Sequence, residues 1–246
     1  AYILYLIKNY QESISQCYEI LNSDDDNIQA LNTLGLCFLK LEKYDEAEKT
    51  LLKAISLDDK NIVILNSLGR LNHELRNSKK AESYFNKAFA LDLNSYETLN
   101  NMAGFYLEEE KYQKAINFYK KAEKLKPNNP ILINNLAKTF ICLHDLESAE
   151  KYSRQAISMD QKNDEFKKTL ALILLKKYDF KNAWLSFDGR LNLSDFTNKN
   201  STIKLVRNKI PNKNISNKNS KILVLREQGV GDELLYGTMY CDLLNE

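Results

Sequence analysis

The feature that most constrains this fold is a repeat of 34 residues. Four consecutive blocks, 28–61, 62–95, 96–129 and 130–163, align without a gap. Small residues recur at three positions of every block: Gly35, Gly69, Ala103 and Ala137 at the eighth, Ala47, Ala81, Ala115 and Ala149 at the twentieth, and Ala54, Ala88, Ala122 and Ala156 at the twenty-seventh. A period of this length indicates that each block is one supersecondary unit that packs against its neighbours.

Each block has the pattern of two antiparallel helices. Large apolar residues such as Leu31, Leu34 and Phe38 recur at helical spacing between the small residues. Two helices approach closely only where their crossing point carries small side chains, which explains the conserved phase of Gly and Ala. A content of only 3 Pro and 7 Gly in 246 residues also favours helices. We therefore predict an all-α fold in which helix-turn-helix units stack into a solenoid.

The pattern resembles the tetratricopeptide repeat, which has small residues at positions 8, 20 and 27, an aromatic residue near 11 and a proline near 32. Here the aromatic residues are Phe38, Tyr106 and Phe140, and the proline is Pro127. The resemblance implies a right-handed solenoid over residues 1–192 that binds proteins or peptides.

The register of the repeat also extends beyond the four blocks. Residues 1–27 match the later part of a repeat, so the chain begins inside one and we expect it to be a fragment. Block 164–197 has Arg190 where an alanine is expected, which predicts a degenerate last repeat.

The candidate binding residues lie on the first helix of each repeat, which in solenoids of this kind lines the concave face. They are asparagines at the fifth and sixth positions and cations at the ninth: Asn32, Asn66, Asn100, Asn101, Asn134, Asn135, Arg70 and Lys138. A side-chain amide offers a donor and an acceptor together, so a row of amides can bind an extended peptide backbone. The cations would add contacts to anions. The alternative is that these residues only form a solvated face of an Asn-rich protein.

The sequence changes character after the repeats. Residues 196–226 carry eight Lys and Arg and no acidic residue. Within them, residues 196–220 are rich in Asn, Ser and Lys, which predicts a linker, with RNA binding as the less favoured alternative. The apolar run 221–225 is typical of a buried strand, and a glycine turn and an amphipathic segment follow it. Residues 221–246 therefore have the pattern of the first strand and helix of an α/β domain.

This tail resembles part of a bacterial enzyme family in which tetratricopeptide repeats precede a heptosyltransferase-like glycosyltransferase domain of GT-B type (family 9). The resemblance rests on Trp184, Asp188 and Arg190, and on the EQGVGD motif of residues 227–232. It implies a nucleotide-sugar donor in the parent enzyme, with Asp232 as candidate general base and Gln228, Gly229 and Gly231 shaping the ligand loop.

Two alternatives remain beside this resemblance. Asp232 could serve only as a helix N-cap, which is a frequent role for Asp after a glycine turn. The chain could also be a non-enzymatic adaptor that binds peptide or protein partners. In either case a truncated domain of 26 residues is not expected to be catalytic by itself.

Composition excludes several other classes of function. A net charge of +2 is not typical of a nucleic-acid-binding protein. The four cysteines have neither a zinc-ligand spacing nor the density of a disulfide framework, which favours a reducing, cytoplasmic location. No apolar run is long enough to span a membrane. We expect no metal site and no cofactor in this part of the protein, and a protein or peptide as its partner.

Overall fold

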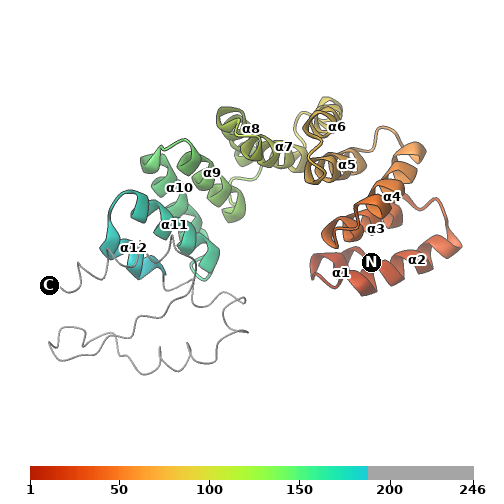
Figure 1. Ribbon diagram of the computed structural model, residues 1–246, viewed down its shortest axis with the longest axis horizontal. Helices are drawn as coiled ribbons and strands as arrows, with labels where there is room; N and C mark the ends of the chain where they lie inside the picture. Colours follow the sequence, from red (N-terminus) through yellow and green to blue (C-terminus); the bar gives the residue numbers. More distant parts are fainter. Residues whose placement is uncertain (188–246) are drawn as a thin grey trace, which may run out of the picture. The chain divides into compact units, whose positions relative to one another are not determined.

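The computed structural model describes residues 1–187, which form twelve α-helices (Figure 1). These are α1 (Tyr2–Leu6), α2 (Tyr10–Ser23), α3 (Ile28–Lys40), α4 (Tyr44–Leu57), α5 (Ile62–Glu74), α6 (Ser78–Leu91), α7 (Tyr96–Glu108), α8 (Tyr112–Leu125), α9 (Pro130–Cys142), α10 (Leu146–Met159), α11 (Asp164–Lys176) and α12 (Phe180–Phe187). None of the helices over this part of the chain is long and apolar enough to cross a membrane.

The helices pack in consecutive pairs, as an all-α repeat fold requires. Each helix from α1 to α9 packs against the next one in the chain, and α3 and α7 each also pack against α5. We call α3, α5, α7 and α9 the A helices and α4, α6, α8 and α10 the B helices. Residues 1–159 form one compact unit, and α11 and α12 pack against each other in a second unit. The predicted stacking of helix pairs is confirmed within residues 1–159.

The small residues of the repeat lie where the helices cross. All twelve of them are buried in the structure. A methyl group added to Gly35 would lie 2.6 Å from Cγ of Leu51, and one added to Gly69 would lie 2.5 Å from Cε1 of Phe85. Both distances are shorter than carbon atoms tolerate, so the eighth position is small because the neighbouring B helix occupies the space.

The turn between the two helices of a repeat has one backbone conformation throughout. Residues with positive φ recur every 34 positions, and all of them carry a side chain: Lys8, Glu42, Arg76, Glu110, His144 and Tyr178. In the first complete repeat, the backbone N–H of Lys43 donates to the carbonyl oxygen of Phe38 at 2.9 Å. The backbone N–H of Glu42 donates to the carbonyl oxygen of Leu39 at 3.3 Å. This pair of bonds is a Schellman motif, which ends the A helix and satisfies its last carbonyl groups.

The last residue of each block caps the A helix that follows. Its side chain accepts a hydrogen bond from a backbone N–H in the first turn of that helix. The capping residues are Asn27 for α3, Asn61 for α5, Ser95 for α7, Asn129 for α9 and Asn163 for α11. These bonds satisfy donors that a helix leaves unpaired at its start. Part of the high asparagine content therefore serves to start helices.

The predicted linker 196–220 and the predicted α/β segment 221–246 lie outside the described residues. The same holds for Gln228, Gly229, Gly231 and Asp232. The glycosyltransferase hypothesis therefore stays a prediction from sequence.

Candidate protein-binding surface

The A helices have one face that neither their own B helix nor the next repeat covers. On α7 this face consists of Glu97, Asn100, Asn101, Gly104 and Glu108, which are exposed or half-buried and follow helical spacing. Equivalent residues are Val63, Arg70, His73 and Glu74 on α5, and Ile131, Asn135, Lys138 and Cys142 on α9. We call this set the A-helix surface. Because α5 and α7 pack against each other, it is continuous between their two repeats.

The predicted row of fifth-position asparagines is not uniformly exposed. Asn32, Asn66 and Asn134 are only 7%, 6% and 2% exposed, whereas Asn100 is half-buried. Asn32 and Asn66 are buried because α3, α5 and α7 approach closely enough for these two amides to face the next A helix.

Two of the buried amides join consecutive A helices. Ser67 Oγ on α5 donates to Asn32 Oδ1 on α3 at 2.8 Å. Asn66 Nδ2 on α5 donates to Thr98 Oγ1 on α7, also at 2.8 Å. Buried bonds of this kind hold the repeats in register, because a shift of one helix would leave polar atoms unpaired in the interior. The sequence signal for these two bonds was a hydroxyl residue in the following repeat, Ser67 for Asn32 and Thr98 for Asn66. Sequence reasoning did not use this signal.

Two amide oxygens on this side of the molecule have no partner. Asn66 Oδ1 and Asn134 Oδ1 are buried and accept no hydrogen bond from any described residue. An unsatisfied buried acceptor costs about 1–3 kcal/mol. Each belongs to an asparagine one helical turn before a cation, Arg70 in α5 and Lys138 in α9.

Gly104 is a residue that sequence reasoning missed. It occupies the ninth position of its repeat, where the preceding repeat has Arg70 and the following one Lys138, both half-buried. A methyl group added to Gly104 would lie 3.8 Å from Tyr119 Oη and would meet no other atom within 4 Å among the described residues. Packing therefore does not require this glycine, unlike Gly35 and Gly69. The signal in the sequence was a glycine inside a helix but outside the eighth position.

His73 links two repeats at the edge of the same surface. Its Nε2 lies 3.5 Å from Glu108 Oε2, and its ring meets the ring of Phe105 edge-on with centroids 5.4 Å apart. The ring is therefore held by α7 although it belongs to α5. Over the described part of the chain, no group of three His, Cys, Asp or Glu residues is arranged to hold a metal ion.

Comparison with protein families identifies the repeats. Tetratricopeptide repeat models match residues 28–61, 62–95 and 106–173, which together make up more than half of the chain. No curated protein matches the chain in sequence.

Solved structures of this fold are similar over most of the chain. PilF of Pseudomonas aeruginosa has a TM-score of 0.62 at 22% identity, over 72% of this chain and 78% of PilF. PilW, a type IV pilus biogenesis factor, has a TM-score of 0.68 at 19% identity, over 83% of this chain and 93% of PilW. MamA of Desulfovibrio magneticus, from its residue 41 to its end, has a TM-score of 0.59 at 16% identity, over 72% of this chain and 98% of that MamA chain.

These identities are low, so the likeness to solved structures shows the fold alone. The family follows from the three sequence matches and from the helix pairs that the described residues form. The chain belongs to the tetratricopeptide repeat family.

Proposed function

We propose that this chain is a protein-interaction scaffold that binds an extended segment of a partner protein along the A-helix surface. The observation that carries the proposal is the uncovered face shared by adjacent A helices, on which Asn100, Asn101 and Arg70 present amide and guanidinium groups. Such groups bind a peptide backbone and an anionic side chain without any catalytic chemistry.

The arrangement of the surface supports an extended ligand. Asn100 and Asn101 lie on α7, one turn before Gly104, and Arg70 lies on α5, which packs against α7. The missing side chain at Gly104 would let a partner backbone approach α7 closely. Arg70 would then lie beside that backbone, where it favours an acidic residue of the partner.

The adaptor alternative has more support than the glycosyltransferase hypothesis. The family matches cover repeats only, and none of the comparisons gives support for a glycosyltransferase domain. Asp232 as a catalytic base stays a prediction from sequence.

The test is selection of binding peptides from a random library, followed by affinity measurement with variants. Peptides selected on the chain should bind the double variant Asn100→Ala/Asn101→Ala about fivefold to tenfold more weakly, since two amide contacts to the ligand are lost. Asn22→Ala is the matched control, because Asn22 is an exposed asparagine of α2, outside the A-helix surface.

Asn32 and Asn66 are unsuitable for this test, because their side chains join the repeats and their loss would affect folding. Circular dichroism should show the same helix content for all variants. Equal affinity of the selected peptides for the wild type and for Asn100→Ala/Asn101→Ala would refute the proposal.

A further inference from the structure

Two neighbouring B helices carry an excess of positive charge. Helices α6 and α8 together contain seven lysines and two glutamates. By contrast, α4 contains three acidic residues and two lysines, and α10 two acidic and two basic residues. The excess therefore belongs to the second and third complete repeats, on the helices that do not form the A-helix surface.

Aromatic rings fill the space between these helices. The ring of Tyr106 from α7 stacks on Phe118 of α8 with centroids 5.5 Å apart. Phe118 in turn meets Phe89 of α6 edge-on, with centroids 5.7 Å apart. The three rings form one row from α7 across α8 to α6.

Lysine ammonium groups cover this row. Lys114 Nζ lies 5.1 Å from the centroid of Tyr106, and Lys121 Nζ lies 5.4 Å and 5.6 Å from those of Phe89 and Phe118. Cation–π attraction holds each ammonium group above a ring. The N–H groups that point away from the ring stay able to bind an anion.

Within residues 1–187, the lysines of α6 and α8 are not paired with acidic residues. None of the seven forms an ion pair with a carboxylate of residues 1–187, and all seven are exposed: Lys79, Lys80, Lys87, Lys114, Lys120, Lys121 and Lys124. The carboxylate of Glu82, the only acidic residue of α6, accepts a hydrogen bond from Tyr106 Oη at 2.8 Å.

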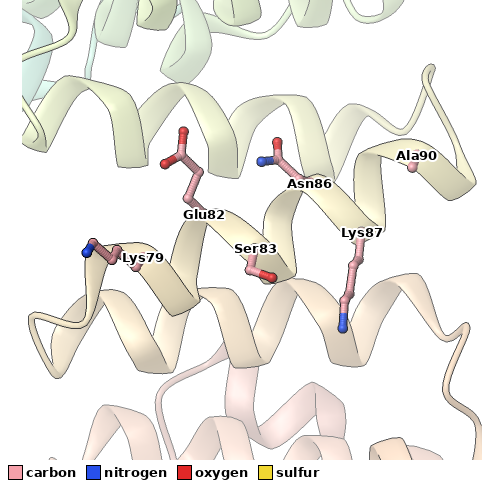
Figure 2. A pocket seen from close by; sticks show the side chains of 6 residues that line it. All are labelled: Lys79, Glu82, Ser83, Asn86, Lys87 and Ala90. Atoms are coloured by element: carbon pink, nitrogen blue, oxygen red, sulfur yellow. The ribbon is translucent and has the colours of Figure 1, made fainter.

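A hollow of about 560 Å³ lies over α6, and its lining includes Glu82, which accepts the hydrogen bond from Tyr106 of the aromatic row. Figure 2 shows Glu82 and Asn86 pointing to one side of this helix and Lys87 to the other. Lys79, Ser83 and Ala90 complete its lining. The short side chains of Ser83 and Ala90 leave room on the helix between the lysines, so a chain could lie across it.

We propose that the exposed surface of α6 and α8, with the lysines and the aromatic row, binds an acidic segment of a partner protein. Lys114 and Lys121 are seven residues apart in one helix, so their backbones are about 10 Å apart along the axis. Carboxylates three residues apart in an extended chain have about the same separation. The unpaired positive charge therefore fits a segment with acidic residues at that spacing.

A nucleic acid fits this surface less well. Single-stranded nucleic acids bind through bases that stack on aromatic faces, in addition to phosphate contacts. The rings of Tyr106, Phe118 and Phe89 already contact each other and the ammonium groups of Lys114 and Lys121. The surface therefore offers charge without a free stacking platform, which favours carboxylates.

The test compares two anionic probes on the whole chain. A fluorescein-labelled oligoglutamate peptide should bind at low ionic strength, and Lys114→Glu/Lys121→Glu should weaken its binding roughly tenfold by reversing two contacts. The control is Lys49→Glu/Lys60→Glu, which makes the same charge change at two exposed lysines outside α6 and α8. It should change the affinity less than twofold.

Three results would overturn the proposal. One is equal weakening by both double variants, which would mean that only net charge matters. Another is absence of oligoglutamate binding by the wild type. The last is tighter binding of an oligouridylate of the same length, with the same sensitivity to Lys114→Glu/Lys121→Glu, which would assign the surface to RNA. The factor by which Lys114→Glu/Lys121→Glu weakens oligoglutamate binding should be the same in the wild type and in Asn100→Ala/Asn101→Ala, which separates this surface from the A-helix surface.

Discussion

Gly69 and Gly104 both lie inside A helices, but a methyl group added to each would meet different surroundings. At Gly69 it would overlap the ring of Phe85, and at Gly104 it would make one ordinary contact with Tyr119. Gly69→Ala should therefore lower the free energy of unfolding by about 1–3 kcal/mol, because the core is overpacked. Gly104→Ala should raise it by about 0.5–1 kcal/mol, because alanine favours the helix. Urea unfolding of the two variants measures both changes, and a decrease for Gly104→Ala would contradict the open space described here.

The same variant separates stability from binding. If a partner backbone approaches α7 at Gly104, the added methyl group should weaken the binding of selected peptides while the protein becomes more stable. Affinity measured beside the unfolding curve shows whether the two effects have opposite signs. A variant that is more stable and binds equally well would mean that the ligand does not approach this position.

Tyr106 provides a pH-dependent signal from the aromatic row. Burial and the neighbouring Glu82 carboxylate raise the pKa of Tyr106 from 10.0 to about 12, because both disfavour the phenolate. A raised pKa means that the unfolded chain loses this proton first, so the contribution of Tyr106 to stability is present below pH 10 and is lost as the pH rises toward 12. The difference in phenolate absorbance between the wild type and Tyr106→Phe measures the titration of Tyr106, and it should appear only at a pH well above 10. The substitution Glu82→Gln should shift this titration to lower pH. A difference transition near the ordinary pKa of tyrosine would show that Tyr106 is not held as described.

At the scale of single elements, the start of each A helix depends on one side chain. Asn61 Oδ1 accepts hydrogen bonds from the backbone N–H groups of Val63 and Ile64 at the start of α5. Asn61→Ala should therefore cost about 1 kcal/mol of stability. Asn94→Ala is the matched control, because Asn94 is exposed and lies in the loop between α6 and α7. Thermal unfolding of both variants tests the difference, and an equal loss for the two would exclude a capping role for Asn61.

The helices themselves could be predicted from the sequence, but their ends and their turns could not. Apolar spacing and small residues at crossing points predict helix pairs, because both follow directly from packing. The left-handed residue of each turn did not stand out, because Glu42, Arg76 and Glu110 are not residues that favour positive φ. The Schellman bonds from the turn back to the last carbonyl groups of the A helix accompany this conformation in each repeat.

The candidate site could be predicted in part for a related reason. The position of each residue within the 34-residue repeat identified which residues lie on the A helices, and Asn100, Asn101 and Arg70 are half-buried there. The position within the repeat did not show that Asn32 and Asn66 face the next repeat, because their burial depends on how closely successive A helices approach. Whether the surface residues bind a partner stays a prediction.

The row of lysines and rings was also missed, since it joins residues of α6, α7 and α8 that belong to two repeats.

At the scale of the whole molecule, the stacked repeats should differ in local stability along the chain. In a solenoid each repeat is stabilised mainly by its neighbours, so a repeat with neighbours on both sides opens least often. Helix α1 contains no buried residue and α2 contains two, whereas the A helices α3, α5, α7 and α9 contain ten, eight, six and eight. Hydrogen exchange should therefore be fastest in α1 and α2 and slower in the A helices from α3 to α9.

Mass spectrometry of peptides from the exchanged protein measures this gradient. Thr98→Val tests its cause, because this change removes the acceptor of Asn66 Nδ2 while it keeps the shape of the side chain. Exchange should then become faster in α5 and α7 and remain the same in α1. Equal exchange along residues 1–159 would instead mean that the unit opens as a whole, since coupling between repeats would then exceed the differences in their burial.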